Sequence, residues 1–547
     1  MDTLPQEIID RIVWFAGGRE LATVSRIFQC SVEKDTFSRY ICSTNSSMQE
    51  FLAKYRGRRW FYLRYITFTV DFPFLIHTEE NPLKCRETKE DLQAHNERFT
   101  CQLLGLFKAL KSLEQETPRP RTTNIELSIK TPFQDDDENM ECHHRRYHSW
   151  RLCLLDPQRL PILSSIHTLT FGEPYYRGSM DKNPGWSDDH LRPLDFGIVP
   201  ALLPKLPKLQ VLNGLPFYER FPEAYEYSIC RYWTRPWEGP WRDTRHAFGN
   251  IMMENADALP AKLQRVHIEF GQSYKRRFNF VDQSVPLPDL VKPSAFDPLS
   301  SALRVLSQPV VSLEIKACVD GTLFWPSSDD PNAKPPHWQH LKYLRIEFLP
   351  VSPSGVWYFQ GPRGEGRETS GFKISQTSYP PLEENEEDER MDEIWAWEWG
   401  RFENFNPNQF RIVPTNEIIE PFLEAFVKAM KNMPQLESAE LFSVLDYYPG
   451  EDLQRKYGEE ELDLKRIWGV KCSLPKDDSC PILEWRVGNW RPSRNLQQSF
   501  YDIWRHRGGK PLEEKWVEEK WLSWDFFEHR AEPAWNPVVR VDTNTIR

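Results

Sequence analysis

The sequence predicts an α/β protein in which helices alternate with the short strands of a parallel sheet. Three observations support this fold class. Short segments with apolar residues at alternate positions recur along the chain, and several of them follow a segment of helical periodicity. The chain also holds 44 Pro and only 25 Gly, which is typical of short elements joined by stiff turns. Repeated helix–turn–strand units build a parallel sheet with helices on one side.

The first predicted element is an amphipathic helix that begins near Pro5 and ends at Gly17-Gly18. Thr3 and Gln6 have the spacing of a capping box, and Pro5 falls in the first turn, where its missing N–H costs nothing. A wide apolar stripe follows at helical spacing, made of Ile8, Ile9, Ile12, Val13 and Phe15.

A second helix is predicted directly after the two glycines. Glu20 lies near its start, and one apolar face contains Leu21, Val24, Phe28 and Val32. Two helices this short cannot stabilise themselves in water, so the rest of the chain or another protein must cover their apolar faces. Periodicity alone slightly favours the rest of the chain.

The predicted strands of the body share the form apolar-x-x-apolar-x-apolar. The clearest are Leu63/Ile66/Phe68, Ile166/Leu169/Phe171, Leu263/Val266/Ile268, Leu341/Leu344/Ile346 and Leu436/Ala439/Leu441. Weaker copies are Ile125/Leu127/Ile129, Leu209/Leu212/Leu215 and Val310/Leu313/Ile315. Predicted helices precede three of these strands, over Phe99 to Leu113, His246 to Ala258 and Ile418 to Met430.

The opening motif resembles the F-box. It reads Leu4-Pro5-x-Glu7-Ile8-Ile9 and is followed by Val24-Ser25-x-x-Phe28, with a stretch between the two halves that is shorter than in a full F-box. The resemblance implies docking on a Skp-type adaptor of a cullin ubiquitin ligase. The adaptor-binding residues that it implies are Leu4, Pro5, Ile8, Ile12, Leu21, Val24 and Phe28.

The body is similar to a leucine-rich-repeat protein with irregular intervals, and an ordinary α/β domain with parallel strands is the alternative. Further motifs, among them Arg64 to Val70, Trp150 to Pro157, Pro353 to Phe359 and Trp485 to Pro492, resemble a large group of filamentous-fungal F-box proteins. The expected fold is therefore α/β, with short F-box-like helices followed by an irregular leucine-rich-repeat-like helix–strand body with long inserted loops. The expected divisions are 1–45 for the F-box-like motif, 46–547 for the body, 360–400 for a flexible acidic and Trp-rich insert, and 500–547 for a C-terminal capping segment.

Composition argues against several function classes. The net charge of −11 opposes broad nucleic-acid binding, and the basic segment 54–64 is expected to be a solvated loop before a strand. The chain shows no secretory leader and no apolar run of about 20 residues, so we expect no membrane span. Its cysteines lie mostly singly, which favours free thiols and an intracellular protein, cytoplasmic or nuclear.

The sequence predicts no catalytic, cofactor-binding or metal-binding residues. The cluster of Cys142, His143, His144, His148 and Cys153 does not have zinc-finger spacing, and a disulfide between Cys472 and Cys480 is not expected. The glycine-rich segment 361–367 lacks the Gly-Lys-Ser/Thr ending of a phosphate loop. Trp395, Trp397 and Trp399 beside an acidic run are either a recognition patch or, more in keeping with their size, anchors of an insert.

These observations predict a protein that is not an enzyme. The resemblance implies the substrate-recognition subunit of a Skp/cullin/F-box ubiquitin ligase, which binds the adaptor through its N-terminal helices and a target protein of unknown identity through its body. The alternative is a leucine-rich-repeat-like interaction scaffold with no ligase role. An enzyme in the α/β body would require a deep pocket with converging polar groups.

Overall fold

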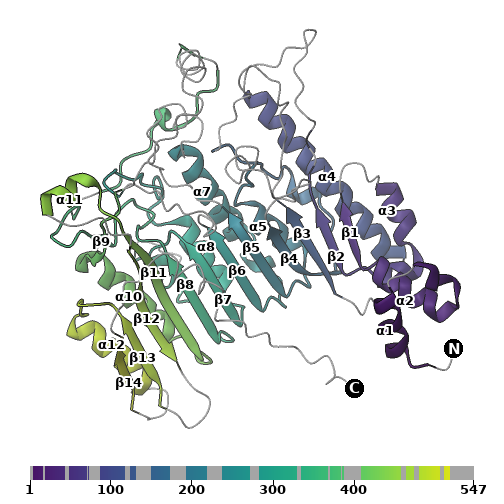
Figure 1. The fold of residues 1–547 in the computed structure, drawn as a ribbon. Helices are drawn as coiled ribbons and strands as arrows, with labels where there is room; N and C mark the ends of the chain where they lie inside the picture. The colour runs from purple at the N-terminus through teal and green to yellow at the C-terminus, as the bar shows by residue number, and fades with distance from the viewer. Residues whose placement is uncertain are drawn as a thin grey trace.

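A single sheet of 12 strands forms the centre of the described chain (Figure 1). The computed structural model describes residues 4–16, 19–42, 48–70, 72, 87–116, 124–130, 149–172, 192–217, 237–270, 283–328, 334–367, 370–383, 385–386, 408–457, 464–473, 480–505 and 511–517. Along the sheet the strands follow the order β1-β2-β3-β4-β5-β6-β7-β8-β11-β12-β13-β14. Strands that are neighbours in this order are therefore mostly consecutive in sequence as well.

The strands are parallel from β1 to β11, and the sheet changes direction only near its end. β11, β12 and β13 pair antiparallel, and β14 pairs parallel to β13. The strand bounds are β1 (Arg39–Cys42), β2 (Tyr65–Phe68), β3 (Ile125–Lys130), β4 (Ile166–Gly172), β5 (Val211–Phe217), β6 (Arg265–Phe270), β7 (Ser312–Ala317), β8 (Tyr343–Phe348), β11 (Ser438–Tyr447), β12 (Leu464–Ser473), β13 (Ile482–Arg486) and β14 (Glu513–Trp516).

The predicted mixed α/β class with parallel strands is confirmed. Each predicted apolar segment overlaps one of the strands from β2 to β8 or β11. In the central strands the apolar positions align into rows across the sheet, one of which joins Leu212, Val266, Leu313, Leu344 and Ala439. The alternating pattern therefore gave both the strands and the face that each one buries.

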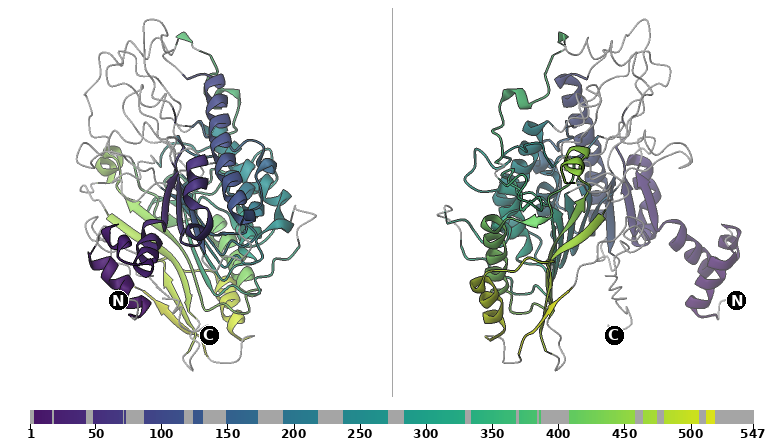
Figure 2. Two further views of the ribbon diagram at one scale, coloured as in Figure 1. Left: turned by 90° about the vertical axis from the view of Figure 1, so that its right-hand side faces the viewer. Right: turned by 60° about the vertical axis from the view of Figure 1, so that its left-hand side comes forward.

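Helices cover one face of the sheet (Figures 1 and 2). The helix bounds are α1 (Gln6–Ala16), α2 (Arg26–Thr36), α3 (Met48–Tyr55), α4 (Lys89–Glu116), α5 (Ile198–Leu202), α7 (Glu238–Glu254), α8 (Pro298–Ser307), α10 (Asn416–Met430), α11 (Glu451–Tyr457) and α12 (Arg494–Arg505). The three predicted body helices lie within or overlap α4, α7 and α10. One continuous apolar core runs between this helix layer and the sheet, from Tyr40 on β1 to Ile503 on α12.

The two ends of the sheet differ from the prediction. β1 was not predicted because its four residues hold only two buried side chains, Tyr40 and Cys42. The segment 54–64, expected to be a solvated loop, instead contains the end of α3 and the 3₁₀ helix η2 (Gly57–Phe61). Arg56 in this segment pairs with Glu116 of α4, Nε to Oε2 at 3.1 Å.

The first part of the predicted flexible insert, 360–400, is held firmly against the body. β9 (Phe359–Gln360) pairs antiparallel with β10 (Val413–Pro414). The buried Arg411 guanidinium lies between the rings of Trp357 and Phe410 and donates to the carbonyl oxygen of Gly366 at 2.8 Å. Gly366 has a φ of +69°, and a Cβ there would clash with that guanidinium. Residues 360–367 are thus an anchored turn.

The C-terminal region adds a last strand to the sheet. The ring of Trp516 on β14 stacks on Trp485 of β13, with centroids 5.5 Å apart. Trp516, one residue of the predicted capping segment, thus lies on the last strand of the sheet. Trp521, Trp524, the Trp395 to Trp399 segment and the acidic run 134–141 lie outside the described residues. In the part of the chain that the structure describes, no helix is both long and apolar enough to cross a membrane.

Candidate binding surface on the N-terminal helices

The N-terminal helices have a small core of their own. Ile9 and Val13 of α1 pack against Phe28 and Val32 of α2, separate from the core of the sheet. Leu21, Ala22 and Ile27 lie partly buried around them. Figure 2 shows these helices standing off from the sheet, on the side away from the helix layer.

Asp10 fixes the angle between α1 and α2. Its carboxylate accepts hydrogen bonds from Gln6 Nε2 at 2.8 Å and Ser31 Oγ at 2.5 Å, and Lys34 Nζ lies 3.0 Å from Oδ2. Burial opposes the charge, but the Ser31, Gln6 and Lys34 contacts outweigh it and lower the pKa of Asp10. The carboxylate therefore stays ionised and keeps the two helices in contact.

The predicted second helix is divided into two elements. The 3₁₀ helix η1 (Arg19–Thr23) comes first, and α2 starts only after Ser25. Ser25 caps α2, with its Oγ accepting from the backbone N–H of Phe28 at 3.4 Å. The continuous helix predicted from Leu21 to Val32 is therefore wrong, because the Ser25 cap begins a new helix after Val24.

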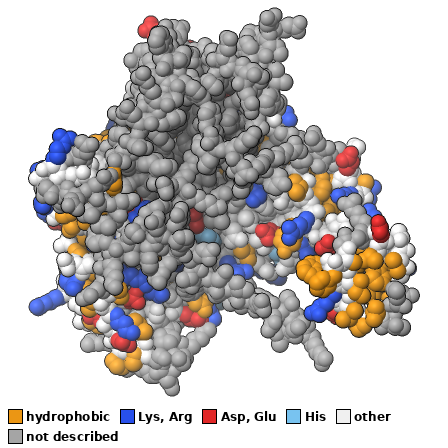
Figure 3. Space-filling model, viewed as in Figure 1, with side chains coloured by type: hydrophobic (Ala, Val, Ile, Leu, Met, Phe, Trp, Pro, Cys, Tyr) orange, Lys and Arg blue, Asp and Glu red, His pale blue; other side chains and the backbone are white. Residues whose placement is uncertain are grey.

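One side of α1 carries an exposed apolar stripe. The exposed fractions are 40% for Leu4, 42% for Ile8, 36% for Ile12 and 78% for Phe15. Trp14, 73% exposed, packs its ring edge-on against Phe15 with centroids 4.7 Å apart. Figure 3 shows the resulting hydrophobic patch over these helices. An exposed apolar patch of this kind is typical of a contact with another protein.

Most, but not all, of the predicted adaptor-binding residues are exposed to solvent. Leu4, Pro5, Ile8, Ile12 and Val24 are exposed, and Leu21 is half-buried. Phe28 is only 3% exposed and packs inside the small core, so in this conformation it supports α1 and does not face solvent. Trp14 was missed, although its place beside Phe15 and just before Gly17-Gly18 was a usable signal.

The helices are joined to the body by a buried carboxylate. Glu33 of α2, 6% exposed, lies 2.7 Å from Arg58 Nη2 and 3.1 Å from Arg59 Nη2, both on η2. The Arg59 guanidinium also stacks over the Phe37 ring at 4.3 Å. Because two arginines of η2 hold this buried carboxylate, α2 is fixed against η2. The exposed stripe on α1 therefore has a defined direction relative to the body.

A second candidate is a cluster of buried charges where α7, α8 and β7 meet. Arg245 Nη2 lies 2.8 Å from Asp297 Oδ2, and both side chains are fully buried. The same guanidinium donates to the Cys318 carbonyl oxygen at 2.9 Å, and Tyr358 Oη donates to the Val319 carbonyl oxygen at 2.8 Å. Because the ion pair is closed to solvent and its atoms bind the backbone, the cluster is structural.

Asp320, next to this cluster, provides a test through pH. Burial, with the nearby Asp297 carboxylate, raises the pKa of Asp320 from 3.8 to about 6. The folded state therefore holds this proton more tightly than the unfolded state, and the free energy of unfolding falls as pH rises from about 4 to about 6. Asp320→Asn keeps an acceptor for the Thr322 N–H, 2.9 Å away, and removes the charge. We expect a gain of about 1–3 kcal/mol at neutral pH and none near pH 4. Urea unfolding at both pH values measures it, and an equal gain at both would contradict this account.

The reactive groups considered in the sequence form no metal cluster among the described residues. In the described ranges no group of three or more His, Cys, Asp or Glu side chains could hold a metal. Cys142, His143, His144 and His148 lie outside those ranges. Cys153 is described, and burial, with the nearby Asp195, raises the pKa of its thiol to about 12, which makes it a poor nucleophile. Cys472 and Cys480 are both free thiols.

Comparison with known proteins adds no relative to this description. No protein-family model, no curated protein and no solved structure matches the chain.

Proposed function

We propose that this chain is the substrate-recognition subunit of a Skp/cullin/F-box ubiquitin ligase. One observation carries the proposal. Helix α1 is apolar on two sides, of which the Ile9/Val13 side is used inside the chain and the Leu4/Ile8/Ile12 side is exposed. An exposed stripe of this kind, in the segment whose sequence resembles an F-box, supports an adaptor as its partner.

The body supports the role of a receptor. We propose that the repeated helix–strand units form an irregular leucine-rich-repeat-like scaffold. β12, β13 and β14 extend its sheet beyond the parallel strands. Such a subunit performs no chemistry itself. It holds a target protein near the ubiquitin that the ligase transfers, so its contribution is proximity. The protein would work inside the cell, where such ligases act.

The contact energy of the stripe is modest. Full burial of a large aliphatic side chain contributes about 1.5–3 kcal/mol, and residues such as Ile8 and Ile12 have already lost more than half of their exposure. Association costs about 4–15 kcal/mol. We therefore expect that Trp14 and Phe15, the most exposed rings of the patch, are needed in addition to the F-box-like positions.

The alternative is an interaction scaffold without a ligase. Two observations favour it: Phe28 is buried inside the chain, and Glu33 fixes α2 on η2. Under this alternative the helices would only extend the end of the sheet. The two functions differ in whether a purified adaptor binds the intact chain.

Truncation of the opening Leu-Pro pair tests the proposal. We expect the full-length protein to bind a purified Skp-type adaptor, and Leu4→Ala/Pro5→Ala to weaken binding by about tenfold, because the pair contributes exposed apolar area at the start of the stripe. Biolayer interferometry measures both affinities. Val24→Ala, on the neighbouring η1–α2 connection, shows whether the surface extends beyond α1. Absence of binding by the unmodified chain would leave the scaffold as the better account.

A further inference from the structure

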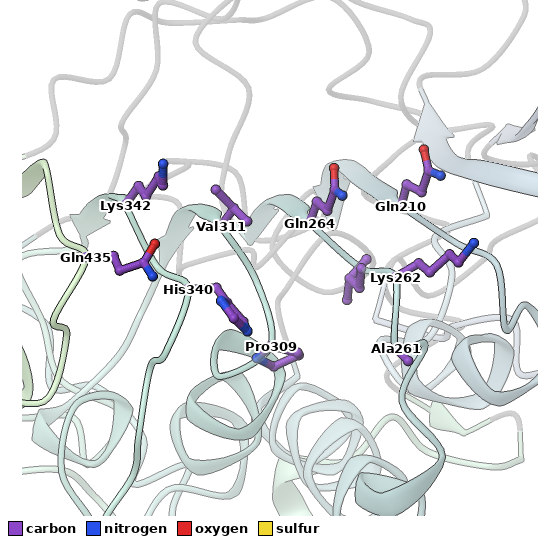
Figure 4. Close-up of a pocket in the computed structure, with 10 residues that line it drawn as sticks. Gln210, Ala261, Lys262, Gln264, Pro309, Val311, His340, Lys342 and Gln435 are labelled. Carbon is purple, nitrogen blue, oxygen red and sulfur yellow. The ribbon is translucent and has the colours of Figure 1, made fainter. Parts of the chain in front are cut away.

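A groove of about 490 Å³ runs along the edge of the sheet where its central strands begin (Figure 4). It is formed by the segments that lead directly into β6, β7, β8 and β11, together with the residue before β5. This edge belongs to the body and is separate from the stripe on α1. Nothing in the sequence pattern pointed to it.

The groove is built from two rows of side chains in equivalent positions. Residues directly before a strand form the first row: Gln210, Gln264, Val311 and Lys342. Residues three positions before a strand form the second row: Lys262, Pro309, His340 and Gln435. The first row is held by backbone bonds, since Gln264 N–H donates to the Gln210 carbonyl oxygen at 2.9 Å and Lys342 N–H to that of Val311 at 2.8 Å. Successive side chains of this row therefore stand about 4.8 Å apart, the strand spacing.

The lining of the groove holds two lysines and one histidine, and one of the lysines is paired. Lys342 Nζ lies 3.3 Å from Glu437 Oε1. Lys262 and His340 are exposed, and among the described residues no hydrogen bond or ion pair engages either side chain. Lys208 occupies the same position before β5, with the same exposure and again no described partner. No carboxylate lies among the residues that line the groove.

The open face of the same sheet is different. There Arg345 lies 2.5 Å from Glu314 and 3.3 Å from Glu440, and Arg486 lies 3.2 Å from Glu440 and 2.6 Å from Glu484. These cations are neutralised by carboxylates on β7, β11 and β13. The whole chain has a net charge of −11 and repels an acidic partner. Lys208 and Lys262, which are unpaired among the described residues, would attract such a partner to this edge of the sheet.

We propose that this groove binds an extended acidic peptide segment of a partner protein. Lys208, Lys262 and His340 would meet its carboxylates. The side-chain amides of Gln210, Gln264 and Gln435 each offer both donors and an acceptor, so they can pair with a peptide backbone. A peptide is favoured over nucleic acid because the lining contains no arginine and no Trp, Tyr or Phe on which bases could stack. The proposal goes beyond adaptor binding and does not depend on it.

The test uses the full-length protein and a fluorescein-labelled peptide of alternating Glu and Ser. We expect binding in fluorescence anisotropy that weakens as NaCl is added. Lys208→Glu/Lys262→Glu should weaken it at least about tenfold, and Gln264→Leu, which removes an amide but no charge, by a smaller factor. Lys108→Glu is the matched control, since Lys108 is an exposed lysine on α4, away from the groove. Its affinity should stay within about twofold of the unmodified protein.

Three results would overturn the proposal. The unmodified protein could fail to bind the peptide, the control could lose as much affinity as Lys208→Glu/Lys262→Glu, or a single-stranded oligonucleotide could bind the groove more tightly than the peptide. Circular dichroism of each variant establishes that the fold is retained. Adaptor binding is measured on the same samples, and it should not change, so failure of the peptide site and failure of the ligase assignment are distinguishable.

Discussion

Replacing Ile8 and Ile12 together by glutamate should reduce adaptor binding by at least about 100-fold while the N-terminal helices stay folded. Both side chains lie on the exposed stripe of α1, 42% and 36% exposed, so the substitutions reach solvent in the free protein. In a complex they would place two carboxylates against an apolar partner surface, where desolvation of each charge costs several kcal/mol. The combined cost of the two charges exceeds the roughly 2.7 kcal/mol that corresponds to 100-fold.

A control on the body separates the stripe from general charge. Lys108 is exposed on α4, outside the N-terminal helices, so Lys108→Glu introduces a carboxylate without touching the patch around Ile8 and Ile12. Its affinity for the adaptor should change by no more than about threefold. Equal losses for Lys108→Glu and Ile8→Glu/Ile12→Glu would mean that general charge repulsion, and not the stripe, governs the contact. Unchanged binding by the double variant would exclude this stripe as the adaptor surface.

The stripe also illustrates how far sequence reasoning reaches. Periodicity found the apolar positions of α1, but it could not say which half faces inward, because Ile8 and Ile9 are equally apolar and adjacent. The choice is made by Phe28, which packs on Ile9 and Val13. The position of Phe28 depends on α2 starting at the Ser25 cap. A continuous helix from Leu21 would have placed Val24 and Phe28 on the same face. Local capping chemistry decided a tertiary arrangement.

The strands that bury alternate apolar residues could be predicted from the sequence. β12, whose sequence does not follow that pattern, could not. Strands from β2 to β8 each bury alternate apolar residues against the helix layer, and that alternation is local. β12 contains Lys465, Arg466 and Lys471, which interrupt the apolar pattern. Lys465 is accommodated because it pairs with Asp446 of β11 at 2.9 Å. Such a pair forms only once the antiparallel register exists, so the sequence of β12 alone does not reveal the strand.

The sequence pattern did not predict the groove, because its residues lie far apart along the chain. Lys262 and Gln264 look like ordinary exposed residues of a turn before a strand, and so do His340 and Lys342. Only the parallel register brings these turns together, across sequence separations that periodicity cannot connect. Identical positions in successive repeat units thus become neighbours in space, and a weak preference for polar residues in each turn adds up to one polar surface.

Asp297→Ala should cost about 3–5 kcal/mol in the free energy of unfolding, because it leaves a buried cation without its partner. The Asp297 carboxylate accepts from Arg245 Nη2 at 2.8 Å and also caps α8 through the Ser300 N–H at 2.9 Å. Truncation removes the cap, worth about 1 kcal/mol, and leaves a fully buried guanidinium without its carboxylate. Urea unfolding followed by tryptophan fluorescence measures the loss, and hydrogen exchange should show α8 opening first.

A double-mutant cycle assigns that cost to its cause. Adding Arg245→Met to Asp297→Ala removes the orphaned charge, so the double variant should be more stable than Asp297→Ala alone, because the penalty lies in the unpaired cation and not in the lost attraction. Glu424→Ala on α10 is the matched control, an exposed carboxylate whose loss should change stability by less than about 0.5 kcal/mol. If Asp297→Ala cost no more than this control, the guanidinium would have to be satisfied by backbone carbonyls such as that of Cys318, and α8 would be held by its apolar face alone.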